Sequence, residues 1–246
     1  GGVFVCLQRW HGLEPLFWQR SKALIGQEGL DRLAASHVLI IGLGGVGSFA
    51  AEAIARSAVG NITLVDYDHI EASNLNRQLP ALISTLGSYK TEIIARRIRD
   101  INPEAHINIC TCRYDPANSE QILTPRPDFV IDAIDSLAEK IHLIKACLSA
   151  GIPIISSMGT ARRLHPELLR IGDIRETSMC PLARKIRQAL RQEEITGRLP
   201  VVYSLEKPLP ERNSDRRALG SMAFVPASAG ILLASFVINQ MLENVQ

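Results

Sequence analysis

The residues best suited to chemistry lie in the stretch VLIIGLGGVGSFAAEAIARS, residues 38–57. An apolar run leads into a glycine cluster, in which Gly42, Gly44 and Gly47 satisfy the pattern G-x-G-x-x-G, with Gly45 between them, and an amphipathic run follows. Glycines permit a tight turn and a close approach of the backbone, and a helix N-terminus favours an anion. The stretch therefore predicts a phosphate-binding loop between a strand and a helix.

Residues 66–78, which follow the next apolar run, distinguish between a phosphate of NAD and a phosphate of ATP. Asp66 has the spacing expected of a carboxylate that binds a ribose hydroxyl, which suits an NAD-dependent oxidoreductase as well as an ATP-using enzyme. Residues 66–78, DYDHIEASNLNRQ, then add Asp68, Asn74 and Arg77. Charge moves toward the departing pyrophosphate when ATP forms an adenylate, and the planar fork of arginine suits that charge. The segment therefore favours ATP.

Two further charged groups follow. Lys90 opens the next predicted helix and supplies a second positive charge beside Arg77. Asp132 and Asp135 come at the end of another apolar run, in DAIDS. Ligands bind at the carboxyl ends of parallel strands, and carboxylate oxygens are ligands that Mg²⁺ prefers. The sequence therefore predicts a site for ATP and Mg²⁺.

The predicted elements alternate in a way that brings these residues to one edge of a sheet. Apolar runs typical of strands cover residues 37–42, 61–66, 107–112, 129–133, 153–157 and 168–174. Runs typical of helices cover residues 24–35, 46–57, 88–101, 136–150 and 181–194. Such alternation implies right-handed crossovers and a parallel sheet. We expect an α/β, Rossmann-like fold with a mostly parallel sheet flanked by helices, then a C-terminal extension with a few further strands and a buried C-terminal helix from about Ala227.

Composition is ordinary for a soluble globular protein, with 246 residues, 46% of them hydrophobic, and a net charge of +2. The five cysteines form no C-x-x-C pair, which argues against a cysteine-bound zinc site, and their odd number without a secretory signal indicates a cytoplasmic setting. Residues 218–242 carry no charge, but Pro226 and scattered polar residues favour a buried helix over a membrane span. Residues 205–221 are predicted to form a mobile loop.

The order of GLGGVGS, D-Y-D, SNLNRQ, Lys90 and DAIDS resembles the ubiquitin-activating-enzyme-like adenylation superfamily over about residues 20–160. Members of that superfamily activate carboxylates as acyl-adenylates. The resemblance implies that nucleotide is bound by Gly42, Gly44, Gly45, Gly47, Asp66, Asp68, Asn74, Arg77 and Lys90. It also implies that Asp135 carries Mg²⁺ and acts in catalysis with Arg77 and Lys90.

The N-terminal part carries a weaker match to the same superfamily. Its members have a motif R-[FY]-x-R, whose second arginine reaches the ATP of the partner subunit. Residues 17–20 read FWQR, so Arg20 matches the second arginine and Phe17 replaces the first. The resemblance therefore implies a homodimer in which Arg20 acts in catalysis across the interface.

The second half of the chain resembles one branch of the superfamily, the tRNA threonylcarbamoyladenosine dehydratases. The residues that carry this resemblance are 156–166, 171–191, 201–209 and 220–238. Near residue 160 the branch usually reads M-G-x-G-N-K-L-D-P, from which Ala161, Arg162, Arg163 and His165 depart. These departures bear on the substrate geometry and on any monovalent-cation site.

The resemblance implies ATP-dependent cyclisation of the modified adenosine next to the tRNA anticodon. The threonine carboxylate is adenylated, pyrophosphate leaves, and the carbamoyl group closes the ring and expels AMP. An intramolecular attack of this kind needs no enzyme nucleophile. The resemblance also allows a sulfur-relay protein as partner. It divides the chain into a lead-in, residues 1–19, an ATP-binding core, residues 20–160, and a substrate- and tRNA-facing extension on the same domain, residues 161–246.

A local excess of positive charge fits a tRNA substrate. Residues 162–217 hold thirteen Lys and Arg against eight Asp and Glu. Basic side chains bind nucleic-acid phosphates, although a solvated helix face has the same composition. The tRNA-binding candidates are Arg162, Arg163, Arg184, Lys185 and Arg187.

Other readings of the sequence stay open at this stage. The enzyme could adenylate the C-terminal carboxylate of a ubiquitin-like or sulfur-carrier protein. The glycine loop and Asp66 alone also fit an NAD-dependent oxidoreductase or a nucleotide sensor. Cys180, before Pro181 at a helix start, could carry a transfer thioester, and His165 could act as a base.

Overall fold

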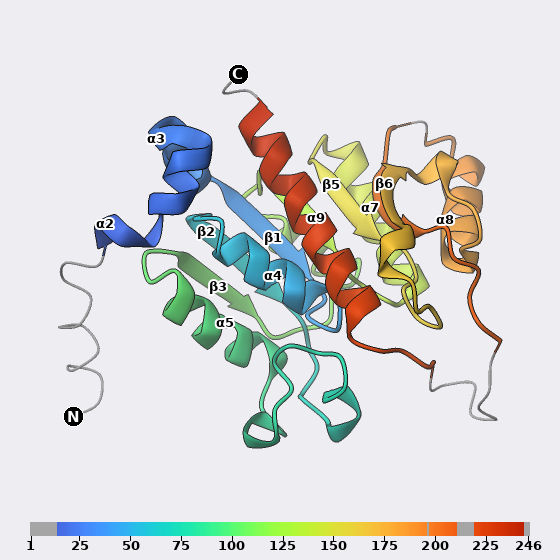
Figure 1. Ribbon diagram of the computed structural model, residues 1–246. Helices are drawn as coiled ribbons and strands as arrows, with labels where there is room; N and C mark the ends of the chain where they lie inside the picture. The colour runs from blue at the N-terminus through green and yellow to red at the C-terminus, as the bar shows by residue number, and fades with distance from the viewer. Residues whose placement is uncertain (1–13, 196, 211–218, 244–246) are drawn as a thin grey trace.

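The backbone folds around one seven-stranded sheet in the order β3-β2-β1-β4-β5-β7-β6 (Figure 1). The computed structural model describes residues 14–195, 197–210 and 219–243. All neighbouring strands are parallel except β6 and β7. The strands are β1 His37–Ile41, β2 Asn61–Val65, β3 His106–Cys110, β4 Phe129–Asp132, β5 Ile154–Ser157, β6 Leu169–Asp173 and β7 Pro200–Ser204. This arrangement confirms the predicted Rossmann-like, mostly parallel sheet.

Helices cover both faces of the sheet, and the strand residues alternate between the two layers. Val38 and Ile40 of β1 pack with α4, α5 and α9, whereas Leu39 and Ile41 pack with α7 and α8. In Figure 1, α4, α5 and α9 lie in front of the strands. The helices are α2 Glu14–Phe17, α3 Gln19–Ala35, α4 Gly47–Ala55, α5 Lys90–Ile101, α6 Ser119–Ile122, α7 Leu137–Ser149, α8 Pro181–Gln192 and α9 Phe224–Leu242. Short 3-10 helices are η1 Ala72–Asn74, η2 Ile83–Thr85, η3 Pro166–Leu168 and η4 Ile174–Glu176.

The last helix, α9, packs directly against α4. A Cβ atom at Gly230 would lie 2.3 Å from the carbonyl oxygen of Val46, so only glycine allows this approach of the two backbones. Among the described residues, α9 is the helix whose length and composition would suit a membrane span. Here Val225, Leu233 and Val237 of α9 belong to the main hydrophobic core. The predicted buried C-terminal helix is thus present, and it begins three residues before Ala227.

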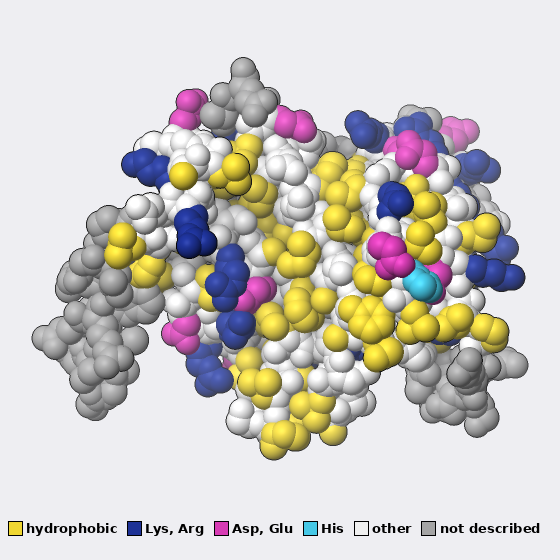
Figure 2. Space-filling view, in the orientation of Figure 1, with side chains coloured by type: hydrophobic (Ala, Val, Ile, Leu, Met, Phe, Trp, Pro, Cys, Tyr) yellow, Lys and Arg dark blue, Asp and Glu magenta, His cyan; other side chains and the backbone are white. Residues whose placement is uncertain are grey.

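A long connection between β2 and α5 carries η1 and η2 and stands at the carboxyl edge of the sheet (Figure 1). Its fold is fixed locally: the Thr85 hydroxyl, itself buried, donates to the carbonyl of Pro80, and the Glu71 amide donates to Asn74 Oδ1. The tip exposes Leu82 and Ile83, which contribute to an apolar surface (Figure 2). This connection places Arg77 beside the glycine loop.

Several predicted boundaries are wrong. The first long helix begins at Gln19, five residues earlier than expected, and bends at Gly26, where φ is +72°. β3 ends at Cys110, so Cys112 lies beyond the strand. The strand β7 was not predicted, because a five-residue apolar run does not distinguish a strand from a buried helix. Part of the predicted loop, residues 211–218, and the lead-in before residue 14 lie outside the described residues.

Candidate nucleotide-binding site

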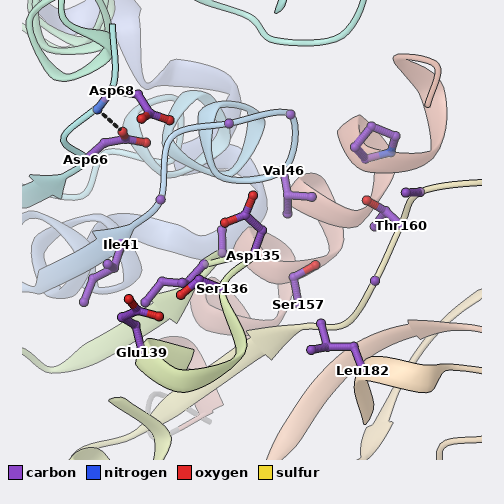
Figure 3. A pocket seen from close by; sticks show the side chains of 18 of the residues that line it. Ile41, Val46, Asp66, Asp68, Asp135, Ser136, Glu139, Ser157, Thr160 and Leu182 are labelled. Carbon is purple, nitrogen blue, oxygen red and sulfur yellow. Dashed lines mark hydrogen bonds between the residues drawn. The ribbon is translucent and has the colours of Figure 1, made fainter. Parts of the chain in front are cut away.

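A cavity of about 720 Å³ opens at the carboxyl ends of the parallel strands. Figure 3 shows Asp66 and Asp68 near one end of it, Thr160 and Leu182 near the other, and Asp135 between the two ends. The cavity crosses the junction of β1 and β4, where the chain order of the strands reverses. Ligands of open α/β sheets bind at such a switch point.

The glycine loop closes the floor of the cavity. Gly42 has a φ of +89°, and a Cβ atom there would lie 2.7 Å from the carbonyl oxygen of Ala133. A Cβ atom at Gly47 would lie only 1.7 Å from the Gly42 carbonyl oxygen, so the turn requires glycine. Gly42, Gly44 and Gly45 line the cavity, whereas Gly47 is buried behind them and does not.

Asp66 ties the glycine loop to the end of β2. Its Oδ2 accepts a hydrogen bond from the Leu43 amide at 2.6 Å, and its Oδ1 accepts one from the Asp68 amide at 2.8 Å. The side chain is 8% exposed and lines the cavity. Burial raises the pKa of this carboxyl, while the positive charge of Lys90 opposes the rise. The two hydrogen bonds therefore fix the position of the carboxyl group at the edge of the cavity.

Two cations face the same end of the cavity. The buried Lys90 Nζ lies 2.7 Å from Asp68 Oδ2. Arg77 Nη1 donates to the carbonyl of Ser73 at 2.8 Å and to Asn76 Oδ1 at 2.9 Å. In the described part of the chain its Nε and Nη2 have no hydrogen-bond partner, which leaves a donor pair for phosphate oxygens.

The two aspartates after β4 have different environments. Asp132 is fully buried, with Lys140 Nζ at 2.7 Å and Ser156 Oγ at 2.6 Å from its Oδ2. The expectation that Asp132 faces Mg²⁺ is therefore wrong, because its charge is already paired inside the protein. Asp135 is exposed in the cavity and has no hydrogen-bond or ion-pair partner among the described residues. Among the described residues, no group of three or more His, Cys, Asp or Glu side chains is arranged to hold a metal ion.

Two other residues expected to contact the nucleotide, Asn74 and Arg20, do not present free side chains to this cavity. Asn74 lines the cavity, but its side chain makes hydrogen bonds within the local turn. Its Oδ1 accepts a hydrogen bond from the Glu71 amide, and its Nδ2 donates one to Ser73 Oγ. Arg20 is exposed at the start of α3 and does not line the cavity of its own chain.

The tRNA-binding candidates separate in the structure. Arg163 is 3% exposed and donates to the carbonyls of Glu206, Gly159 and Ala161, so it holds the chain together and cannot contact tRNA as predicted. Arg187 is half-buried and donates to Thr177. Arg162 is partly exposed and has a φ of +60°, a conformation that is uncommon for residues other than glycine and asparagine.

The basic side chains that remain available lie on α8 and at the cavity. Arg184 and Lys185 are exposed on α8, and no ion pair engages them within the described residues. Lys185 also lines the far end of the cavity, next to Leu182. Figure 2 shows dark blue side chains gathered on the side of the molecule where α8 lies.

Cys180 is 6% exposed and precedes the first residue of α8. It does not line the cavity, although the following Pro181 and Leu182 do. A buried thiol outside the cavity disfavours a transfer thioester. His165 is likewise outside the cavity, and its Nδ1 lies 2.8 Å from Glu167 Oε1.

Several residues that line the cavity were not named individually from the sequence. Ser157 ends β5, and Met158, Gly159 and Thr160 follow it, so their place could have been inferred from the strand-end rule. Nothing in the sequence singles out Arg113 and Glu139. The oxygen atoms Ser136 Oγ and Gln78 Oε1 are buried without a hydrogen-bond partner in the described part of the chain. Both residues line the cavity, so a ligand could satisfy them.

Comparison with known proteins agrees with this geometry. The ThiF family model matches residues 18–242. A Bacillus subtilis protein named tRNA threonylcarbamoyladenosine dehydratase is 41% identical over 243 residues, which cover 93% of this chain and 96% of that protein. An Escherichia coli protein of the same name is 33% identical over 245 residues, 90% of this chain and 91% of that protein.

Solved structures give the same result. The E. coli dehydratase in complex with ATP matches with a TM-score of 0.87 at 32% identity, covering 94% of this chain and 95% of that one. Its complex with AMP matches with a TM-score of 0.85 at 33% identity, covering 91% and 93%. The chain therefore belongs to the ThiF family.

The buried pair beneath the cavity generates a stability prediction. Lys140→Met leaves the Asp132 carboxylate buried without its cation, so we expect the free energy of unfolding to fall by about 3–5 kcal/mol. Lys145→Met, on the same helix, breaks a partly exposed ion pair with Glu193 and should cost less than about 1 kcal/mol. Denaturant unfolding measures both values. Equal effects of the two substitutions would contradict this account of the buried pair.

Proposed function

We propose that this member of the ThiF family is an ATP-dependent tRNA threonylcarbamoyladenosine dehydratase, which works in the cytoplasm. The observation that carries this proposal is the place of Asp135: its carboxylate has no protein partner among the described residues, and it lies in one cavity between the end at Asp66 and the end at Thr160. The names of the relatives and the ATP and AMP complexes of one of them support the same reading.

The reaction needs two substrates side by side. ATP would lie over the glycine loop with its ribose at Asp66, and the modified adenosine would enter from the Thr160 and Leu182 end. A carboxylate oxygen of the threonine attacks the α-phosphorus, and pyrophosphate leaves with the bonding electron pair. The carbamoyl group then attacks the activated carbonyl carbon and gives up a proton to solvent, so that the new bond closes the ring. AMP leaves with one former carboxylate oxygen and the electron pair of the broken carbon–oxygen bond.

Arg77 and Lys90 would stabilise the charge that moves to the pyrophosphate. Arg77 has free donors, and Lys90 is held by Asp68 in a fixed position, so neither needs to reorganise during the step. Mg²⁺ bound between Asp135 and the phosphates would neutralise further charge there. Ring closure requires only that the carbamoyl group lies next to the activated carbon, which agrees with the burial of Cys180.

The function predicts a specific change in the substrate. Incubation with ATP, Mg²⁺ and tRNA that carries threonylcarbamoyladenosine should remove one water from that nucleoside, as seen by mass analysis after gentle digestion. Arg77→Ala and Lys90→Ala should each lower the rate about a hundredfold or more, because each removes charge stabilisation of the transition state. Arg56→Ala, at the C-terminal end of α4 and outside the cavity, should leave the rate unchanged.

Other outcomes separate the competing functions. ATP cleavage without change in the nucleoside would mean that the adenylation site is real and the substrate is wrong. Adenylation of a ubiquitin-like or sulfur-carrier protein would then be tested next. Binding of NAD without ATP turnover would contradict adenylation altogether.

We further propose that α8 contacts the tRNA backbone. Arg184 and Arg191 lie seven residues apart, on one face of the helix, and Lys185 continues this basic surface to the cavity. Phosphate contacts position a nucleic acid without reading its sequence. The surface would therefore guide the anticodon arm toward the second end of the cavity.

This surface predicts a salt-dependent effect on tRNA. The combined change of Arg184, Lys185 and Arg191 to Gln should weaken tRNA binding and reduce the slope of log affinity against log salt by about two to three. ATP binding without tRNA should be unchanged if only the tRNA contact is lost. Substitution of Arg32, which is partly exposed on α3, together with Arg96 and Arg99, which are exposed on α5, serves as the matched control. An unchanged slope in the α8 variant would remove this surface from the account.

We also propose that the enzyme is a homodimer whose sites are completed across the interface. Arg20 is exposed outside the cavity of its own chain, and Leu24, one turn later on α3, is 85% exposed. Leu82 and Ile83 are exposed beside the cavity. Contact of α3 with this apolar tip in a second copy would bury both surfaces and bring Arg20 to the partner's ATP.

Mixing inactive variants tests the shared site. Arg20→Ala and Arg77→Ala should each be nearly inactive alone. In a refolded equal mixture, about a quarter of all sites should combine an intact Arg77 with an intact Arg20 from the other copy. Recovery of about that fraction of activity is expected, and absence of any recovery would place Arg20 in the site of its own chain or outside catalysis.

A further inference from the structure

An ion pair between Arg113 and Glu139 lines the cavity, and the proposed reaction gives it no role. Arg113 follows the end of β3, and its Nη2 pairs with Oε1 of Glu139 in the first turn of α7. The Arg113 guanidinium carbon also lies 5.7 Å from the centre of the Tyr67 ring. All three side chains line the cavity. The pair therefore joins the segments that follow β2, β3 and β4.

The pair lies on the opposite side of the sheet from the phosphate-binding cations. The glycine loop leads into α4, and Lys90 opens α5, which both belong to one helical layer. Arg113 and Glu139 are next to Tyr114 and α7, in the other layer. A nucleotide whose phosphates lie at α4 and whose ribose lies at Asp66 extends its base toward that second layer.

The cavity wall at this end has the character of a base-binding slot. Ile41, Val65, Ile134 and Leu137 line it, and all of them belong to the hydrophobic cluster on the α7 side. In Figure 3, Ile41 is drawn near Glu139 and Ser136, below Asp66. An apolar floor suits the flat face of a purine, and the ion pair lies where its polar edge would be.

We propose that Glu139 and Arg113 select the adenine base of ATP, an inference that rests on the proposed function. Oε1 of Glu139 is engaged by Arg113, whereas Oε2 has no partner among the described residues. A carboxylate oxygen accepts a hydrogen bond from the exocyclic amino group of adenine and repels the carbonyl oxygen that guanine and hypoxanthine carry at the same position. Arg113 acts as a positioning residue that fixes the carboxylate and covers the base.

The partial burial of the Arg113–Glu139 pair favours a measurable preference for one base over another. The Glu139 side chain is 16% exposed, and that of Arg113 is 56% exposed. A hydrogen bond to a largely buried charged group is stronger than one at the open surface, and the wrong base would leave that group unpaired. The site should therefore prefer ATP by about tenfold or more over inosine triphosphate, whose base has a carbonyl in place of the C6 amino group and a proton on N1.

Binding of the two nucleotides in the absence of tRNA tests the proposal. Calorimetry with the full chain should give the tenfold or greater preference for ATP in the unmodified protein. Glu139→Gln should bring the ratio near one, because an amide can donate to the carbonyl of hypoxanthine. Arg113→Met should weaken ATP binding several-fold and shrink the preference. Glu193→Gln, which breaks the Lys145 pair elsewhere on α7, should leave both affinities unchanged.

Each other outcome contradicts the proposal in a recognisable way. A ratio unchanged by Glu139→Gln, or equal binding of the two nucleotides to the unmodified protein, would overturn base selection while ATP binding and dehydration stand. A variant that binds ATP normally but has a raised KM for tRNA would assign the pair to the substrate adenosine instead. Failure of any nucleotide to bind would overturn this proposal together with the adenylation site.

Discussion

The convergence of parallel strands at one edge is the constraint on which the rest of the structure depends. β1 and β4 lie side by side although they are far apart in the sequence, and the polar segments that follow them meet because both strands point the same way. Strand ends place three parts of the cavity: the turn at Gly42 follows β1, Asp66 follows β2, and the segment around Asp135 follows β4. A register shift of one residue would send Asp66 to the other face of the sheet and separate it from the Leu43 amide.

The two aspartates that follow β4 differ in burial, and this difference separates a structural role from a possible role in ligand binding. Asp132 is enclosed with Lys140 and Ser156, and its Oδ1 accepts the Ile134 amide, so it anchors the segment that carries Asp135. Asp135 lies in the cavity and has no protein partner in the part of the chain that the structure describes. A buried charge needs a partner to offset its desolvation, whereas an exposed one is free to bind a ligand. The buried carboxylate of Asp132 therefore stabilises the fold, whereas the exposed carboxylate of Asp135, three residues later, is available to a ligand.

Much of the fold and part of the cavity could be predicted from the sequence, because local patterns carry that information. Glycines before a helix and an acidic residue after the next strand indicated the loop and Asp66. The roles of Asp132 and Arg163 could not be predicted in this way, since their burial depends on neighbours such as Ser156 and Glu206 that are distant in the chain. Arg113 and Glu139 were missed for the same reason: their pairing arises only when β3 and α7 are brought together.

Activation of the threonine carboxylate as an adenylate in this cavity can be followed with heavy oxygen. The enzyme is incubated with ATP and tRNA in which both oxygens of that carboxylate are labelled. The released AMP should carry one labelled oxygen in its phosphate, because AMP leaves with an oxygen that was part of the carboxylate. Cyclised nucleoside formed with unlabelled AMP would contradict adenylation of the carboxylate, even if the nucleoside had lost one water.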